Sequence, residues 1–274
     1  AEGKKIQAAQ SQVWKDILNP IYERQETRVQ ELAAQLGYQG IVPISEQLRN
    51  VNLKDLIAKS QKLIKDSDAL YREMFPEQVR KVMGIEPEKF TRADIGFFGS
   101  VPGYKKFFPP ELTIPAFLDF LEGMGLDMKT AAGTDIVIDD ELREKKEPRA
   151  ACYSITVPDD IRVTLKPSGG IPDFETFFHE GGHALHFANS TSPVWEFQQL
   201  GNNAITESYA IFLENVWGDP QWLAHYREFV KGYNRFQPPA KKVPLMTDAE
   251  IGELMRNRMY WDLYFVRRYN GAKL

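Results

Sequence analysis

Apolar residues recur every three or four positions through most of this chain, which is the spacing of an amphipathic helix. Between residues 52 and 83, one face of such a helix carries Leu53, Leu56, Ile57, Leu63 and Ile64. The same spacing predicts further helices at residues 4–18, 22–36, 117–124, 172–189, 204–217, 219–234 and 248–268. The dipeptide Asn19–Pro20 is expected to separate the first two of these helices. The chain is therefore predicted to be mainly α.

The apolar period changes to that of β-strands between about residues 134 and 166. Three short runs there, "DIVID", "AACYSITV" and "IRVTL", are rich in β-branched residues and are bounded by turn signals. The last two runs predict a hairpin across Pro158–Asp160. We therefore expect a small β-sheet embedded in a helical protein. The prediction is a single domain over residues 1–274, with a helical N-terminal lobe (1–130), the sheet (131–170) and a second helical lobe (171–274).

Composition restricts the classes of partner that the chain can bind. A net charge of −4 gives no electrostatic basis for binding nucleic acid, and no run approaches the roughly 20 apolar residues of a membrane span. Cys152 is the single cysteine, so any metal must be bound by histidine and carboxylate. Without a recognisable signal peptide, a cytoplasmic protein is expected, and a processed secreted or periplasmic form stays open. The oligomeric state is left unassigned.

Three of the four histidines lie in the stretch "TFFHEGGHALHFAN", which begins at Thr176. His179 and His183 are one turn apart on the same face of the predicted helix. Two imidazoles in this arrangement can bind one Zn²⁺, and Glu180 lies beside them to act on a water molecule. The pattern therefore predicts a zinc-binding helix with Glu180 as its catalytic carboxylate.

A catalytic zinc has three protein ligands and one open position, so a third ligand is required. The predicted helix "NAITESYAIFLENVWG" carries Glu207 and Glu214 on one otherwise apolar face, where a carboxylate is costly unless it is paired or binds a metal. We assign Glu207 as the third ligand and Glu214 as the group that orients an imidazole, and the reverse assignment stays open. His186 is expected beside the site, which should hold one zinc ion per chain.

These residues resemble those of a known family. The segment "FETFFHEGGHALH", with Glu207 lying 28 positions after His179, is similar to the thimet oligopeptidase and oligoendopeptidase F family of zinc metallopeptidases. The resemblance covers roughly residues 146–217, including the predicted strand pair before the motif. It implies that His179, His183 and Glu207 bind zinc and that Glu180 is the general base. It also implies a zincin-like helical fold that encloses a channel for short peptides.

Two features depart from that family. Gly181 occupies a position where the family usually has a bulky residue, and the pair Gly181–Gly182 is expected to let another segment approach the zinc closely. Family members are also longer and carry a C-terminal segment whose Tyr and His bind the tetrahedral intermediate. That segment is not found in this sequence. Tyr260, Tyr264 and Tyr269 share only the residue type with it.

The strand predicted to start at Ala150 can bind an extended peptide by adding it as another strand. Ala150, Ala151 and Tyr153 are therefore the candidate substrate-binding residues, while a purely structural strand is the alternative. The predicted partners are short peptides.

The predicted function is zinc-dependent hydrolysis of peptide bonds. Two alternatives stay open. One is an HExxH zinc carboxypeptidase, which would need Arg149 or the pair Arg256 and Arg258 to bind the substrate carboxylate. The other is a non-catalytic fragment that binds zinc and peptides without turning them over.

Overall fold

The computed structural model describes residues 2–199 and 203–271 and divides the chain into two compact units. The first unit joins residues 1–99 to residues 260–274, and the second comprises residues 100–259. The strands and the helix predicted to bind zinc, assigned to separate lobes from the sequence, lie together in the second unit. The single domain proposed from the sequence stays a prediction.

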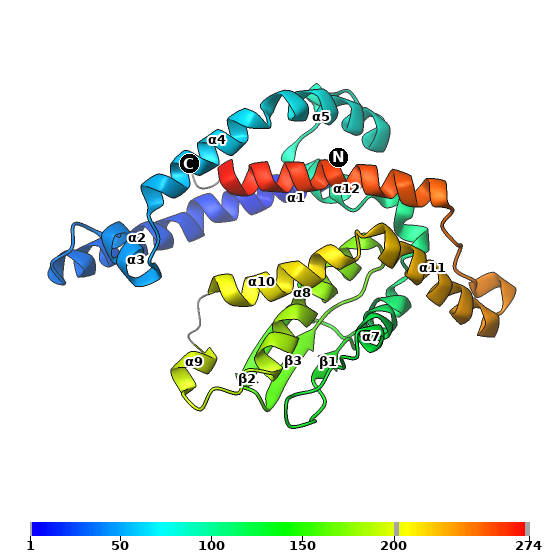
Figure 1. Cartoon of the computed structure of the whole chain (residues 1–274). Helices are drawn as coiled ribbons and strands as arrows, with labels where there is room; N and C mark the ends of the chain where they lie inside the picture. The colour runs from blue at the N-terminus through cyan, green and yellow to red at the C-terminus, as the bar shows by residue number, and fades with distance from the viewer. Residues whose placement is uncertain (1, 200–202, 272–274) are drawn as a thin grey trace. The chain divides into compact units, whose positions relative to one another are not determined.

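Helices make up the regular structure of the first unit over its described residues (Figure 1). Their hydrophobic core contains Val79, Phe98 and Tyr260, packed against partly buried side chains that include Tyr71 and Tyr264. Tyr260 and Tyr264 therefore have a packing role in this unit. The helices are α1 (Glu2–Val13), α2 (Asn19–Gln35), α3 (Ile41–Arg49), α4 (Leu53–Asp66), α5 (Asp68–Met83), α6 (Ile95–Gly99) and the last part of α12 (Asp248–Gly271).

The expected break at Asn19–Pro20 is wrong, because the chain stays helical from α1 into α2. Residues Trp14–Leu18 form a π-helical turn, and α2 begins directly after it. Proline cannot donate a backbone hydrogen bond, and its ring clashes with the carbonyl four residues earlier. A wider turn immediately before Pro20 accommodates both effects without ending the helix.

The long helix expected at residues 52–83 is divided at Ser67 into α4 and α5. The hydroxyl of Ser67 donates to the carbonyl of Leu63 at 2.7 Å. Serine in this position competes with the helical backbone bonds and bends helices, which explains the division. No helix in the described part of the chain is both long and apolar enough to cross a membrane.

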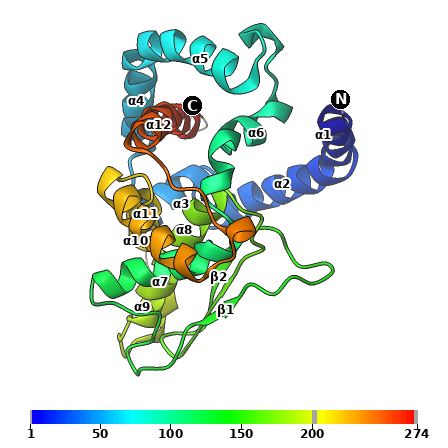
Figure 2. The same cartoon turned by 90° about the vertical axis from the view of Figure 1, so that its right-hand side faces the viewer.

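In the second unit, α8 packs against strands β2 and β3 and against α10, as Figures 1 and 2 both show. The helices of this unit are α7 (Thr113–Gly123), α8 (Ile171–Ala188), α9 (Trp195–Gln199), α10 (Asn203–Val216) and α11 (Pro220–Tyr233), followed by the first part of α12. Helices α8, α10 and α11 begin and end within one residue of the predicted limits, because their apolar faces follow the helical period. Helix α7 begins four residues earlier than predicted, and α9 was not predicted.

The small sheet has the strand order β1-β3-β2, so β2 lies at an edge. Its strands are β1 (Val137–Asp139), β2 (Ala151–Thr156) and β3 (Asp160–Thr164). β2 and β3 form the predicted antiparallel hairpin, and β1 pairs with β3 in parallel. The prediction of a mainly α protein with a small embedded sheet is confirmed.

Aromatic residues fill the core of the second unit on the buried side of α8. Phe174, Phe177 and Phe178 are fully buried there and contact the rings of neighbouring helices edge to face. Tyr226 of α11 is also buried, and its hydroxyl donates to the carbonyl of Phe107 at 2.8 Å. This core holds α8 rigidly at the centre of the unit, which suits a helix that carries candidate metal ligands.

Candidate metal centre

Helix α8 begins where the sequence predicts and presents His179 and His183 one turn apart. Pro172 lies in its first turn, and the carboxylate of Asp173 accepts backbone hydrogen bonds from the loop immediately before the helix. The two imidazole rings face each other edge to face, with 4.8 Å between their centroids. The helical spacing therefore places both imidazole rings next to each other on one face of α8.

Glu207 of α10 completes a group of three candidate ligands whose donor atoms lie within 4.8 Å of one another. The Nε2 atoms of His179 and His183 are 3.2 Å apart. The carboxylate oxygens of Glu207 lie 3.6 and 3.8 Å from these two nitrogens. The structure thus brings together all three residues that the sequence indicates as ligands.

These separations fit a tetrahedral metal ion. Zinc bonds of about 2.0–2.1 Å to nitrogen and oxygen place neighbouring ligand atoms roughly 3.3 Å apart. When neither Nε2 atom carries a proton, the two repel each other at 3.2 Å, and a cation between them would remove that repulsion. Two imidazoles and one carboxylate form a donor set that Zn²⁺ commonly uses.

The other nitrogen of each ring, Nδ1, has a hydrogen-bond partner on α10. Glu214 Oε2 lies 2.7 Å from Nδ1 of His179, and because a carboxylate only accepts, this Nδ1 carries the proton. Thr206 Oγ1 lies 2.8 Å from Nδ1 of His183. The geometry therefore places Glu207 at the ligand position and Glu214 behind an imidazole. Thr206 was not predicted, although its position directly before Glu207 could have suggested a role.

The surroundings of the two rings shift their pKa values in opposite directions. The hydrogen bond to Glu214 raises the pKa of His179, because the carboxylate stabilises the imidazolium form. Burial lowers the pKa of His183, and the neighbouring His179 lowers it further. His183 is therefore held in the neutral form that a metal ligand requires.

Two glycines let the elements around α8 approach closely. A Cβ atom on Gly182 would lie 2.6 Å from both Ala210 Cα and the carbonyl oxygen of Tyr209 in α10. A Cβ atom on Gly181 would collide with the ring of Phe117 in α7. Gly182 thus permits close approach of α10, the helix that carries Glu207, and Gly181 permits close approach of α7. Close approach of either segment to a zinc ion stays a prediction.

Glu180 lies in the same pocket as the three candidate ligands, a hollow of about 400 Å³. Its Oε2 accepts a hydrogen bond from the backbone N–H of Cys152 in β2 at 2.8 Å. Burial raises the pKa of Glu180 above its usual value, and the nearby His179 opposes that effect. Strand β2 therefore forms one wall of this pocket.

The candidate substrate-binding residues Ala150, Ala151 and Tyr153 line this pocket as well, and their substrate role stays a prediction. Arg149 lines it beside them. Arg258, by contrast, donates to Asn215 and stacks over the ring of Trp217. Of the arginines considered for a substrate carboxylate, Arg149 is the one that borders the candidate metal ligands.

His186 lies beside the three-residue group, as expected, and is not a member of it. Its ring stacks on Tyr209 of α10, with 4.7 Å between the centroids. Its buried Nδ1 has no hydrogen-bond partner among the residues that the structure describes, and burial lowers the pKa of the ring. His186 thus contributes to the packing of α8 against α10.

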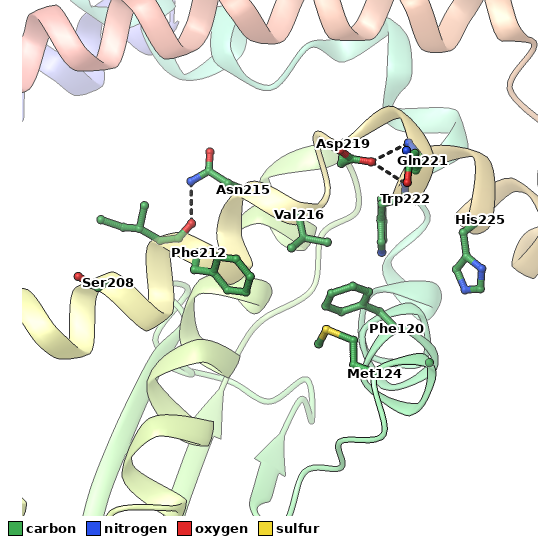
Figure 3. Close-up of a pocket in the computed structure, with 12 residues that line it drawn as sticks. Phe120, Met124, Ser208, Phe212, Asn215, Val216, Asp219, Gln221, Trp222 and His225 are labelled. Carbon is green, nitrogen blue, oxygen red and sulfur yellow. Dashed lines mark hydrogen bonds between the residues drawn. The ribbon is translucent and has the colours of Figure 1, made fainter.

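A second pocket lies on a different face of α10 and is predominantly apolar. Figure 3 shows Phe120 and Met124 facing Phe212 and Val216 across it, with Trp222 on a third side. Its volume is about 850 Å³, and none of the predicted zinc ligands lines it. At its rim, His225 forms an ion pair with Asp119 at 2.6 Å, which agrees with an ordinary structural role for this histidine.

No protein-family model, no curated protein and no solved structure matches this chain. The resemblance to the thimet oligopeptidase and oligoendopeptidase F family therefore rests on the residues quoted above and stays a prediction. The geometry of the site itself supplies the basis for a function.

Proposed function

We propose that this protein is a zinc-dependent metallopeptidase that hydrolyses peptide bonds in short peptides. The observation that carries the proposal is the convergence of His179, His183 and Glu207 within 4.8 Å of one another, with Glu180 in the same pocket. These three residues would hold one Zn²⁺ per chain. Zinc, when bound, supplies Lewis acidity that activates water and polarises a carbonyl group.

Glu180 would transfer the protons of the reaction. As a carboxylate it would accept a proton from the attacking water and then deliver it to the leaving amine. Its place in the same pocket as the three candidate ligands supports this role. Glu214 and Thr206 would keep both imidazoles oriented through the cycle.

The substrate would lie along the edge of β2. An extended peptide can add to an open sheet edge through backbone hydrogen bonds, and this edge borders the pocket that contains Glu180. Such recognition depends little on side chains, which suits an enzyme for short peptides of varied sequence. Ala150, Ala151 and Tyr153 would contact the peptide there.

Metal analysis combined with peptide cleavage tests the proposal. Wild-type protein and Glu180→Gln should each contain about one zinc per chain, while Glu207→Ala should lose most of it. Of these three proteins, only the wild type should cleave a quenched fluorescent peptide. Glu228→Gln is the matched control, because Glu228 is exposed on α11 and pairs with Lys231, so metal content and cleavage should both be retained. Wild-type protein without zinc, or full activity in Glu180→Gln, would contradict the proposal.

The position of Arg149 favours a carboxypeptidase as the second candidate. Its guanidinium borders the same pocket and can bind a substrate carboxylate in two parallel hydrogen bonds. Peptides with an amidated C-terminus separate the two activities, because an endopeptidase cleaves them and a carboxypeptidase does not. Zinc binding without cleavage of either peptide would support the non-catalytic alternative.

A further inference from the structure

The backbone of β2 alternates between groups that face β3 and groups that face the open edge. On β3, the N–H of Leu165 donates to Asp139 of β1, so odd-numbered residues of this strand pair with β1. Even-numbered residues therefore pair with β2, where they lie opposite Ala151 and Tyr153. It follows that Cys152 directs its backbone N–H and C=O toward the open edge, as the hydrogen bond to Glu180 shows directly.

We propose that the backbone N–H of Cys152 positions Glu180 for its role as general base. This inference rests on the proposed hydrolytic function. The N–H donates to Oε2 of Glu180 at 2.8 Å, and no other described residue donates a hydrogen bond to this carboxylate. One bond therefore sets the orientation of the side chain and leaves Oε1 free to accept the proton from water.

The donor is itself held firmly. Cys152 lies opposite Val163 of β3, which is fully buried, and α8 packs against both strands. Both ends of the hydrogen bond thus belong to elements of one packed unit. A hydrogen bond between an N–H and a carboxylate is roughly twice as strong as one between neutral groups. A neutral peptide carbonyl would consequently not displace Glu180 from this donor.

This arrangement determines which edge groups remain for a substrate. A peptide along β2 can donate to the carbonyl of Cys152, but within the strand its nearest free backbone donor is Ser154, the next outward-facing residue of β2. The side chain at position 152 has no part in this scheme. Any residue with a backbone N–H should replace Cys152, and proline should not.

The single cysteine permits a direct test in zinc-free protein. Labelling with ¹⁵N-cysteine yields one backbone amide signal, that of Cys152. In Glu180→Ala this amide proton should shift upfield, and its exchange with solvent should be about tenfold faster or more, because a hydrogen bond to a charged group is lost. Glu147→Ala removes a carboxylate from the same pocket that does not bond Cys152, so the signal should stay in place.

A pair of substitutions then tests positioning in the zinc-loaded enzyme. Cys152→Ala keeps the N–H and serves as the reference for loss of the thiol. Cys152→Pro also removes the N–H, at an edge position, which tolerates proline. Relative to Cys152→Ala, this variant should keep its zinc and a KM within about twofold, while kcat falls at least about tenfold.

Two results would overturn the inference: an amide signal that is unchanged in Glu180→Ala, or a folded Cys152→Pro variant with the kcat of Cys152→Ala. If circular dichroism shows that Cys152→Pro does not fold, the amide signal of Cys152 in Glu180→Ala is the remaining test of the inference. If zinc-loaded wild type cleaves no peptide, the proposed function fails, and the amide signal still decides whether Cys152 holds Glu180. The two failures are therefore distinguishable.

Discussion

A methyl group at position 182 should separate the two helices that carry the candidate zinc ligands. The Cβ atom of Gly182→Ala would lie 2.6 Å from Ala210 Cα and 2.6 Å from the carbonyl oxygen of Tyr209. Both are backbone atoms inside α10, so neither can rotate away from the new methyl group. Because Glu207 belongs to α10 and the two histidines belong to α8, the helices must move apart at the site itself.

The expected magnitude follows from these contacts. Carbon atoms pack best at about 3.5–4.0 Å, so the new contact is short by about 1 Å. Overpacking a core costs about 1–3 kcal/mol, while replacing glycine by alanine inside a helix stabilises by about 1 kcal/mol. The free energy of unfolding of the zinc-free protein should therefore fall by only about 0–2 kcal/mol.

Zinc binding should respond more strongly than stability. Metal–ligand distances tolerate shifts of only about 0.2 Å, so a displacement approaching 1 Å removes Glu207 from bonding distance. We expect the zinc Kd to rise at least about 100-fold, which corresponds to about 2.7 kcal/mol. Competition with a chromophoric chelator measures this Kd, and urea unfolding of the zinc-free proteins measures the change in stability.

Gly252→Ala in α12 is the matched control. Its Cβ atom would meet no atom closer than Arg256 Nη1 at 3.9 Å, so the same chemical change creates no collision. This variant should gain up to about 1 kcal/mol and keep the wild-type zinc Kd. A wild-type Kd in Gly182→Ala would refute the reasoning. So would an equal loss of zinc affinity in both variants.

Four further predictions concern the surroundings of the site and the core. Glu214→Gln removes the charge that holds the Nδ1 proton of an imidazole, so the zinc Kd from chelator competition should rise about 10–100-fold. Lys146→Met removes a buried ammonium group that donates to the Asp139 carboxylate and to two backbone carbonyls, so urea unfolding should show a loss of about 2–3 kcal/mol. Arg143 and Lys146 lower the pKa of Asp139, so its stabilisation is present above the pKa of the unfolded chain and is lost as the pH falls through the folded value. An unfolding midpoint that stays constant from neutral to strongly acid pH would contradict this. Tyr226→Phe removes a buried hydrogen bond and should lower the unfolding free energy by about 1 kcal/mol, as thermal or urea unfolding can show.

Features that depend on neighbours within one helix could be predicted well. The spacing of His179 and His183 places both rings on one face of any α-helix, and α8 presents them in that way. Similarly, Glu207 and Glu214 had to share a face of α10. The apolar periods also predicted the class of fold, because amphipathic faces bury themselves wherever the helices dock.

Interactions made by backbone groups could not be predicted from the sequence. The hydrogen bond from Cys152 to Glu180 uses an N–H that every residue except proline possesses. Nor does the sequence indicate that Pro20 follows a π-helical turn, since a proline more often ends a helix than widens the turn before it. Whether a proline ends a helix or follows a widened turn depends on how the whole unit packs.

The sequence by itself determined the ligand types, their spacing along each helix and the mainly α class, because these follow from covalent connectivity and the helical period. Only the tertiary structure decided which glutamate faces the Nε2 atoms, since that depends on how α10 docks against α8. The docking in turn depends on Gly182, whose missing side chain lets two backbones meet. Contacts between segments distant in the chain have no fixed sequence spacing, and for that physical reason the geometry of the site had to come from the fold.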